Sequence, residues 1–134
     1  MGGFFLFKIM IFNFKLKVII ISLLILNFCP GTAFTNEFED AVELINQRNY
    51  KGAYNMIVPL AEKGRAAAQL VLGMMYFKGT GVERNIIEAD KWLILSEKLG
   101  QEAGKKNRIF IERQMSRNQI EKAHKLAKSW LQKH

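Results

Sequence analysis

Apolar residues after about residue 36 recur at intervals of three and four, which is the spacing of an amphipathic helix. This pattern predicts five helices over about 37–47, 51–63, 65–77, 86–100 and 102–115, and a sixth that reaches Leu131. The alternation of apolar and polar residues that marks a strand is not found outside the N-terminal segment. We therefore predict that the mature chain is all-α.

Polar residues, glycine and proline indicate where these helices begin and end. Capping boxes at Asn36–Glu39 and Ser116–Gln119 predict two helix N-termini, and Asn85 is a predicted N-cap. Gly64 is expected to end the second helix. Pro59 lies inside that helix and predicts a kink, because it has no amide hydrogen and clashes with the preceding turn.

Several apolar side chains are expected to form the core. Trp92 and Trp130 both fall on apolar helical stripes, so we assign them to packing rather than to ligand stacking. In the fifth helix we expect Ile109 and Phe110 to be buried. Gly73 lies inside a helix, where glycine costs roughly 1 kcal/mol relative to alanine. Its presence predicts that another backbone packs closely against it.

The clearest supersecondary pattern is a pair of helices within 66–100, joined by the turn Gly79–Gly81, where glycine permits positive φ angles. A weak repeat offset by 36 residues relates the stretch ending at Gly64 to the one ending at Gly100. Repeat units bury their apolar faces against neighbours, so end units look atypical. We predict a short α-solenoid of antiparallel helix pairs. Its predicted parts are a signal peptide (1–33), a degenerate N-terminal helix pair (34–64), a repeat (65–100) and a C-terminal capping helix pair (101–134).

This pattern resembles the Sel-one-like repeat, a relative of the tetratricopeptide repeat. The resemblance covers most of residues 38–131 and rests on Ala66, Ala68, Gln69, Leu72, Gly73, Tyr76, Gly79, Gly81, Val82, Ala89, Trp92 and Gly100. It implies a scaffold that binds other proteins. Ser96 and Glu97 stand where the family has a pair of alanines, and Glu97 predicts that this helix end is solvated.

The N-terminal segment resembles a secretory signal. Three lysines and no acidic residue precede the apolar run Val18–Phe28, and Gly31 and Ala33 occupy the −3 and −1 positions of a cleavage site after Ala33. We expect export to the periplasm or the medium. An uncleaved inner-membrane anchor is the alternative, although the apolar run is short of the roughly 20 residues that span a bilayer. Cleavage would remove Cys29, the single cysteine.

Charge is unevenly distributed. The formal net charge is +8, and residues 105–134 hold nine basic and two acidic residues. Lys122, Lys125 and Lys128 are expected to face outward, either toward an anionic surface or simply as the solvated face of a capping helix. We expect no nucleic acid partner, because the basic residues are not interleaved with exposed aromatic ones.

The sequence predicts no catalytic, cofactor or metal site. His124 and His134 lie ten residues apart, and neither a His-Glu-x-x-His nor a Cys-x-x-Cys spacing occurs. Glu88 and Asp90 are two residues apart on a helix, so they point to different faces.

The predicted function is that of a non-catalytic adaptor of the bacterial envelope or secreted fraction, with a protein partner of unknown identity. Tyr50, Tyr54, Met74 and Lys78 are less clearly needed by the core and are candidates for partner contacts. An envelope glycan-binding or hydrolase-like protein is one alternative, and hydrolysis would require two convergent carboxylates in a cleft. A membrane-tethered module whose basic tail contacts anionic lipid is the other.

Overall fold

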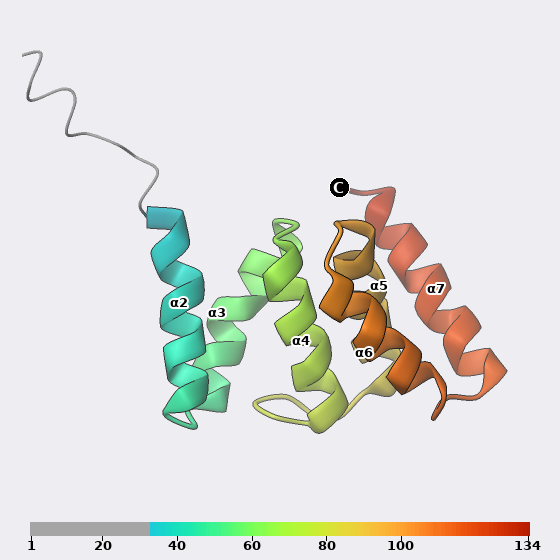
Figure 1. The fold of residues 1–134 in the computed structure, drawn as a ribbon, viewed down its shortest axis with the longest axis horizontal. Coiled ribbons are helices and arrows are strands. Elements are labelled where there is room, and N and C mark those ends of the chain that lie inside the picture. The colour runs from blue at the N-terminus through green and yellow to red at the C-terminus, as the bar shows by residue number, and fades with distance from the viewer. Residues whose placement is uncertain (1–32) are drawn as a thin grey trace, which may run out of the picture. The chain divides into compact units, whose positions relative to one another are not determined.

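The computed structural model describes residues 33–134, so all of the predicted signal peptide except Ala33 lies outside the described residues. Residues 33–134 contain six α-helices and no strand, which confirms the all-α prediction. The helices are α2 (Ala33–Asn46), α3 (Tyr50–Glu62), α4 (Ala66–Lys78), α5 (Ile86–Lys98), α6 (Glu102–Glu112) and α7 (Arg117–Leu131). Residues 35–134 form one compact unit, in which α2, α3 and α4 follow one another in chain order and both α6 and α7 pack against α5 (Figure 1).

Two of the three predicted helix starts are confirmed. The Asn85 side chain accepts hydrogen bonds from the amides of Ile87 and Glu88, at 3.1 Å each. Ser116 and Gln119 form the predicted capping box. The start predicted at Asn36 is wrong, because α2 already begins at Ala33. A capping side chain stabilises a helix start by only about 1 kcal/mol. Additional helical hydrogen bonds made by the residues before it can outweigh that contribution.

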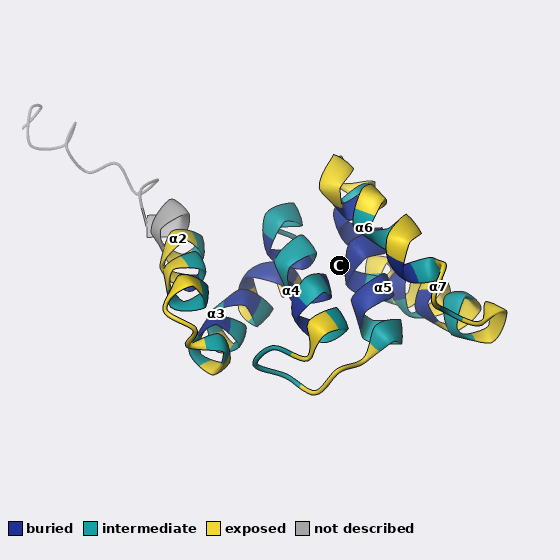
Figure 2. Ribbon diagram, turned by 60° about the horizontal axis from the view of Figure 1, so that its bottom comes forward, coloured by how far each residue is buried: buried dark blue, intermediate teal, exposed yellow. Residues whose placement is uncertain are grey.

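The core lies where the helices face one another, as the dark blue parts of the ribbon in Figure 2 show. Helix α5 is central, since it packs against α4, α6 and α7. Trp92 is 5% exposed, and its ring meets that of Trp130 edge to face at 6.0 Å. The predicted packing role of both tryptophans is therefore confirmed.

The predicted burial in α6 is wrong at two positions. Ile109 is 40% exposed and Phe110 is 55% exposed, whereas Ile111 is fully buried. Successive helical residues point about 100° apart, so a helix that presents Ile111 to the core turns its neighbour Phe110 outward. Phe110 touches the fold through an edge-to-face contact with Phe77, with ring centroids 6.1 Å apart.

The end of α5 is solvated only in part, whereas Glu97 predicted that it is solvated. Lys98, Leu99 and Gly100 are exposed, as expected, but Ser96 and the residues before it are packed. Ser96 is fully buried and donates a hydrogen bond of 2.9 Å to the carbonyl oxygen of Ala66. A Cβ atom at Gly104 would lie 3.0 Å from the Ser96 Oγ, so α6 approaches α5 closely there. Glu97 accepts a 2.6 Å hydrogen bond from Arg108 of α6. Helix α6 thus covers α5 at Ser96 and contacts Glu97, while the residues that follow face solvent.

Two glycines of the repeat occupy positions that a larger residue cannot take without displacement. Gly81 has a φ of +75°, and a Cβ atom there would lie 2.2 Å from the carbonyl oxygen of Tyr50. At Gly73 it would lie 2.9 Å from the Leu93 Cγ and 3.0 Å from the carbonyl oxygen of Ala89. The close backbone approach predicted at Gly73 is confirmed. The two contacts fix the turn against α3 and fix α4 against α5.

None of the helices within residues 33–134 is both long enough and apolar enough to cross a lipid bilayer.

Candidate functional site

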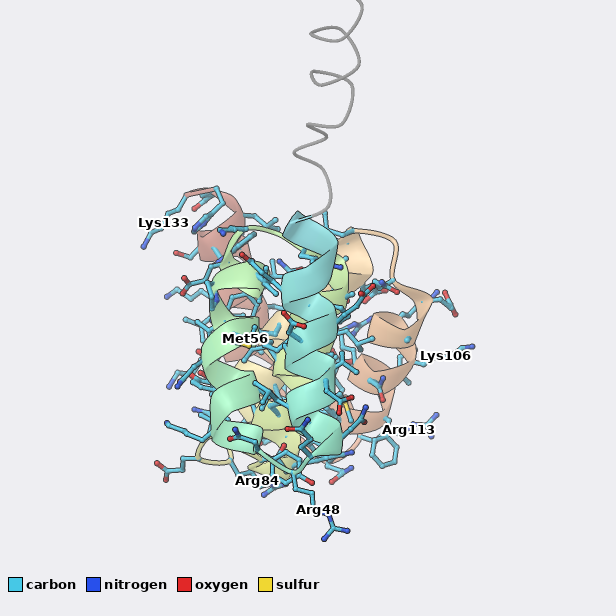
Figure 3. The ribbon with its side chains drawn as sticks, turned by 90° about the vertical axis from the view of Figure 1, so that its left-hand side faces the viewer. Arg48, Met56, Arg84, Lys106, Arg113 and Lys133 are labelled. Atoms are coloured by element: carbon cyan, nitrogen blue, oxygen red, sulfur yellow. The ribbon has the colours of Figure 1, made fainter. Side chains whose placement is uncertain are left out.

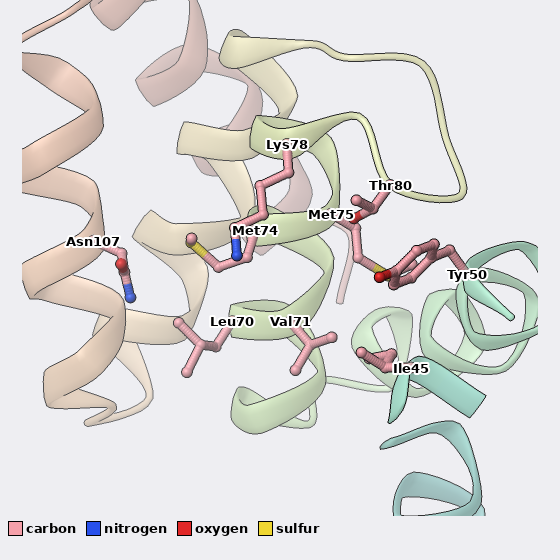
Figure 4. A pocket seen from close by; sticks show the side chains of 9 residues that line it. All are labelled: Ile45, Tyr50, Leu70, Val71, Met74, Met75, Lys78, Thr80 and Asn107. Carbon is pink, nitrogen blue, oxygen red and sulfur yellow. The ribbon is translucent and has the colours of Figure 1, made fainter. Parts of the chain in front are cut away.

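A groove of about 410 Å³ runs along one face of α4 (Figure 4). Its α4 residues are spaced by three and four, which places them on one side of the helix. Residues from α2, α3, α6 and the glycine turn complete it. The lining residues are Ile45, Tyr50, Leu70, Val71, Met74, Met75, Lys78, Thr80 and Asn107. We call this the α4 groove.

The structure brings three of the four candidate partner residues on α3 and α4 together. Tyr50, Met74 and Lys78 line the α4 groove. Tyr54 does not, because its hydroxyl group shares a 3.0 Å hydrogen bond with that of Tyr76 and its ring packs edge to face against the Tyr76 ring. Burial, reinforced by this hydrogen bond, raises the pKa of Tyr76. Tyr54 therefore has a packing role.

Sequence reasoning missed the other side of the groove. Ile45 of α2 and Asn107 of α6 lie on helices that are distant from α4 along the chain. Nothing in their local sequence distinguishes them from other half-buried residues of an amphipathic helix. Only the way in which α2 and α6 pack in the folded chain makes Ile45 and Asn107 line the same groove as Met74.

The lining of the α4 groove suits binding rather than acid–base catalysis. Its surface is mainly apolar, and Lys78 is its single charged side chain. No carboxylate lines it, so the paired acids that glycoside hydrolysis requires are not found in this groove. Methionine side chains are flexible and polarizable, which lets such a surface adapt to apolar groups of different shape.

The basic side chains of the C-terminal helices are exposed, as predicted. Lys122, Lys125 and Lys128 all face solvent, and Figure 3 shows Lys106 and Lys133 extending from the surface as well. Lys125 and Lys128 border a second hollow of about 520 Å³ between α5 and α7. Lys122 does not line it.

We expect that replacing Lys122, Lys125 and Lys128 together by glutamine leaves the fold intact. Their side chains are exposed, and glutamine has nearly the helix propensity of lysine. The thermal midpoint and the helical circular dichroism of the triple variant should remain close to those of the wild type. A clear loss of helicity would show instead that these charges stabilise α7.

A buried acidic side chain lies away from the α4 groove. Asp90 of α5 is fully buried, and neither of its carboxylate oxygens has a hydrogen-bond partner. Burial, with a smaller contribution from nearby Glu112, raises the pKa of Asp90 to about 7. One ligand atom each of Asp90, Glu112 and His124 lie within 4.8 Å of one another. We call these three residues the α5–α7 cluster.

No pattern in the sequence points to the α5–α7 cluster. Its members lie on α5, α6 and α7, and their spacings along the chain match no metal-ligand or catalytic motif. The prediction that Glu88 and Asp90 point to different faces is confirmed, because Glu88 binds Lys91 at 2.6 Å while Asp90 points into the protein. Asp90 and Glu112 do not form the solvent-accessible acid pair of a hydrolase, because Asp90 is closed off from solvent.

The helix pairs and the groove along α4 define a helical repeat protein, an α-solenoid. No family model matches the chain, and no curated protein matches it either. Among solved structures, the chain is similar to the crystal structure of c5321, a protective antigen present in uropathogenic Escherichia coli strains that displays an SLR (Sel-one-like repeat) fold. The TM-score is 0.67 and the sequence identity is 26%, over 72% of this chain and 22% of that one.

The comparison confirms the resemblance drawn from the sequence, and the chain has the Sel-one-like repeat fold. The chain spans about a fifth of the length of c5321. The fold is that of a repeat module of the kind that generally acts as a scaffold for protein interactions.

Proposed function

We propose that the chain is a non-catalytic protein-binding module whose α4 groove holds an apolar segment of a partner protein. The observation that carries this proposal is the uncovered face of α4, where Leu70, Val71, Met74 and Met75 meet at the floor of a groove of about 410 Å³. A groove of this volume lies within the usual range of binding pockets. Similarity to a repeat fold that serves as a scaffold supports the same conclusion.

The positive charge of Lys78 in the groove indicates the chemistry of the partner segment. Lys78 is exposed and forms no ion pair with any of residues 33–134. A partner segment that combines apolar side chains with one acidic residue would fill the floor of the groove and place its carboxylate near the Lys78 ammonium group. Such a charge mainly sets the orientation and specificity of a bound segment, while apolar contacts supply most of the affinity.

Selection of a phage-displayed random peptide library on the full chain tests this proposal. We expect the selected peptides to share apolar residues and one acidic residue. Lys78→Glu should weaken their binding about tenfold, because it replaces attraction by repulsion. Lys125→Glu, the same charge change on exposed α7, is the matched control and should change the dissociation constant less than twofold. Equal losses in both variants, or peptides without an acidic residue, would count against the groove.

We also propose that the chain acts outside the cytoplasm, in the envelope or the medium, on the basis of its N-terminal sequence. Mass spectrometry of protein from fractionated cells should find a mature N-terminus at Phe34. A chain that retains Val18–Phe28 and fractionates with the inner membrane would favour the tethered alternative.

A further inference from the structure

We propose that Asp90, Glu112 and His124 form a zinc site that joins α5, α6 and α7. The sequence predicted no such site, because the three residues come from separate helices. The structure brings one ligand atom of each to within 4.8 Å of the others. Two carboxylates and an imidazole are the side chains that, with a water molecule, complete a four-coordinate zinc site.

The geometry of the α5–α7 cluster is close to what zinc requires. The Glu112 Oε1 lies 3.4 Å from the His124 Nε2. In a tetrahedral site with metal–ligand bonds of about 2.1 Å, two ligand atoms lie about 3.4 Å apart. The longest separation in the cluster, up to 4.8 Å, must shorten by up to about 1.4 Å for tetrahedral binding, a movement that side-chain rotation can supply.

Asp90 is the residue of the cluster that lacks a binding partner. It is fully buried, and both of its carboxylate oxygens are without a partner. A buried carboxylate is costly unless it is paired or coordinates a metal. Other charged groups nearby are paired, since Arg108 binds both Glu97 and Glu112 at 2.6 Å. A cation between Asp90 and Glu112 would provide the missing partner.

The net negative charge around the cluster would neutralise the two positive charges of a divalent cation. Metal binding requires the ionised form of Asp90. In that form Asp90, Glu97 and Glu112 contribute three negative charges and Arg108 contributes one positive charge, which leaves an excess of two negative charges when His124 is neutral. The Arg108 Nη1 donates a hydrogen bond of 2.6 Å to the Glu112 Oε1. A metal ion must therefore share that oxygen with Arg108 or bind Oε2, and the hydrogen bond from Arg108 would hold the Glu112 side chain in place.

The imidazole selects the kind of metal. Mg²⁺ and Ca²⁺ prefer sites built from oxygen ligands alone, whereas an imidazole suits zinc and its neighbours in the transition series. The side chain of His124 is 53% exposed, so an ion can enter from solvent on that side. A bound ion would cross-link the last three helices of a chain whose single cysteine lies in the predicted signal peptide.

Calorimetric titration of the metal-stripped full chain with ZnCl₂ tests the proposal. We expect one ion bound per chain, no competition by an excess of MgCl₂, and a visible absorption spectrum of tetrahedral type when Co²⁺ replaces Zn²⁺. Asp90→Asn and His124→Gln should each weaken zinc binding at least tenfold. His134→Gln is the matched control, because His134 is the other histidine of residues 33–134 and stacks on Trp130 instead. It should change the affinity less than twofold.

A stability measurement separates the loss of a ligand from the loss of the fold. With EDTA at about pH 8, Asp90→Asn should melt no lower than the wild type, because it removes a buried and unpaired charge. With zinc, the wild type should gain in thermal midpoint and Asp90→Asn should not. The proposal is overturned if the chain binds no zinc, if Asp90→Asn and His124→Gln leave the affinity unchanged, or if His134→Gln abolishes binding.

Discussion

Gly81→Ala is expected to destabilise the fold by about 2–5 kcal/mol, the largest effect we expect of any substitution that adds a single methyl group. The φ of +75° at Gly81 costs an alanine about 1–2 kcal/mol. The added Cβ would also lie 2.2 Å from the carbonyl oxygen of Tyr50, far inside van der Waals contact. Either the glycine turn or the start of α3 must move. Overpacking of this kind typically costs about 1–3 kcal/mol more.

The backbone strain and the contact with Tyr50 can be measured separately. Gly100 has a similar φ of +85°, but a Cβ atom there would have nothing within 4 Å. Gly100→Ala should therefore show the cost of the φ angle alone. Thermal or urea unfolding of both variants gives the difference, and we expect Gly81→Ala to melt about 10 °C or more below the wild type. Equal midpoints for the two variants would mean that the turn does not rest on α3.

Gly73→Leu is expected to destabilise the fold by about 3 kcal/mol. The new side chain would start 2.9 Å from the Leu93 Cγ and 3.0 Å from the Ala89 carbonyl oxygen, at the interface of α4 and α5. Leucine has a helix propensity about 1 kcal/mol better than that of glycine, but it is too large for this site. Since α5 also packs against α6 and α7, a displacement at Gly73 affects most of the core.

Ala103→Leu is the matched control for this substitution. Ala103 lies on the exposed side of α6, so a leucine there adds apolar volume to a helix without entering a packed interface. Its free energy of unfolding in urea should stay within about 0.5 kcal/mol of the wild type. If Gly73→Leu behaved like Ala103→Leu, α4 and α5 would not be in close contact at Gly73.

Much of the fold could be predicted from the sequence because helices are encoded locally. The N-cap at Asn85, the capping box at Ser116 and the core position of Trp92 each depend on residues within a few positions of one another. The errors arose where local rules compete with packing. The Ile109–Ile111 run is apolar throughout, and only the rotation of α6 against α5 decides that Ile111 is buried while Phe110 is not.

The candidate sites were predictable only in part. The residues that contribute one face of α4 to the groove, among them Met74 and Lys78, share a helical stripe and could be singled out from the sequence. Asn107 could not, since it reaches the groove only because α6 lies beside α4.

The sequence by itself determined that the part of the chain after the predicted signal peptide is built of helices, where several of these begin, and that glycines form the repeat turn. These features follow from hydrophobic periodicity, capping side chains and the φ angles that glycine permits. The tertiary structure alone decided that one face of α4 stays uncovered as a groove and that Asp90 meets Glu112 and His124. Those outcomes depend on how helices far apart in the chain pack together, and no local pattern of residues records that packing.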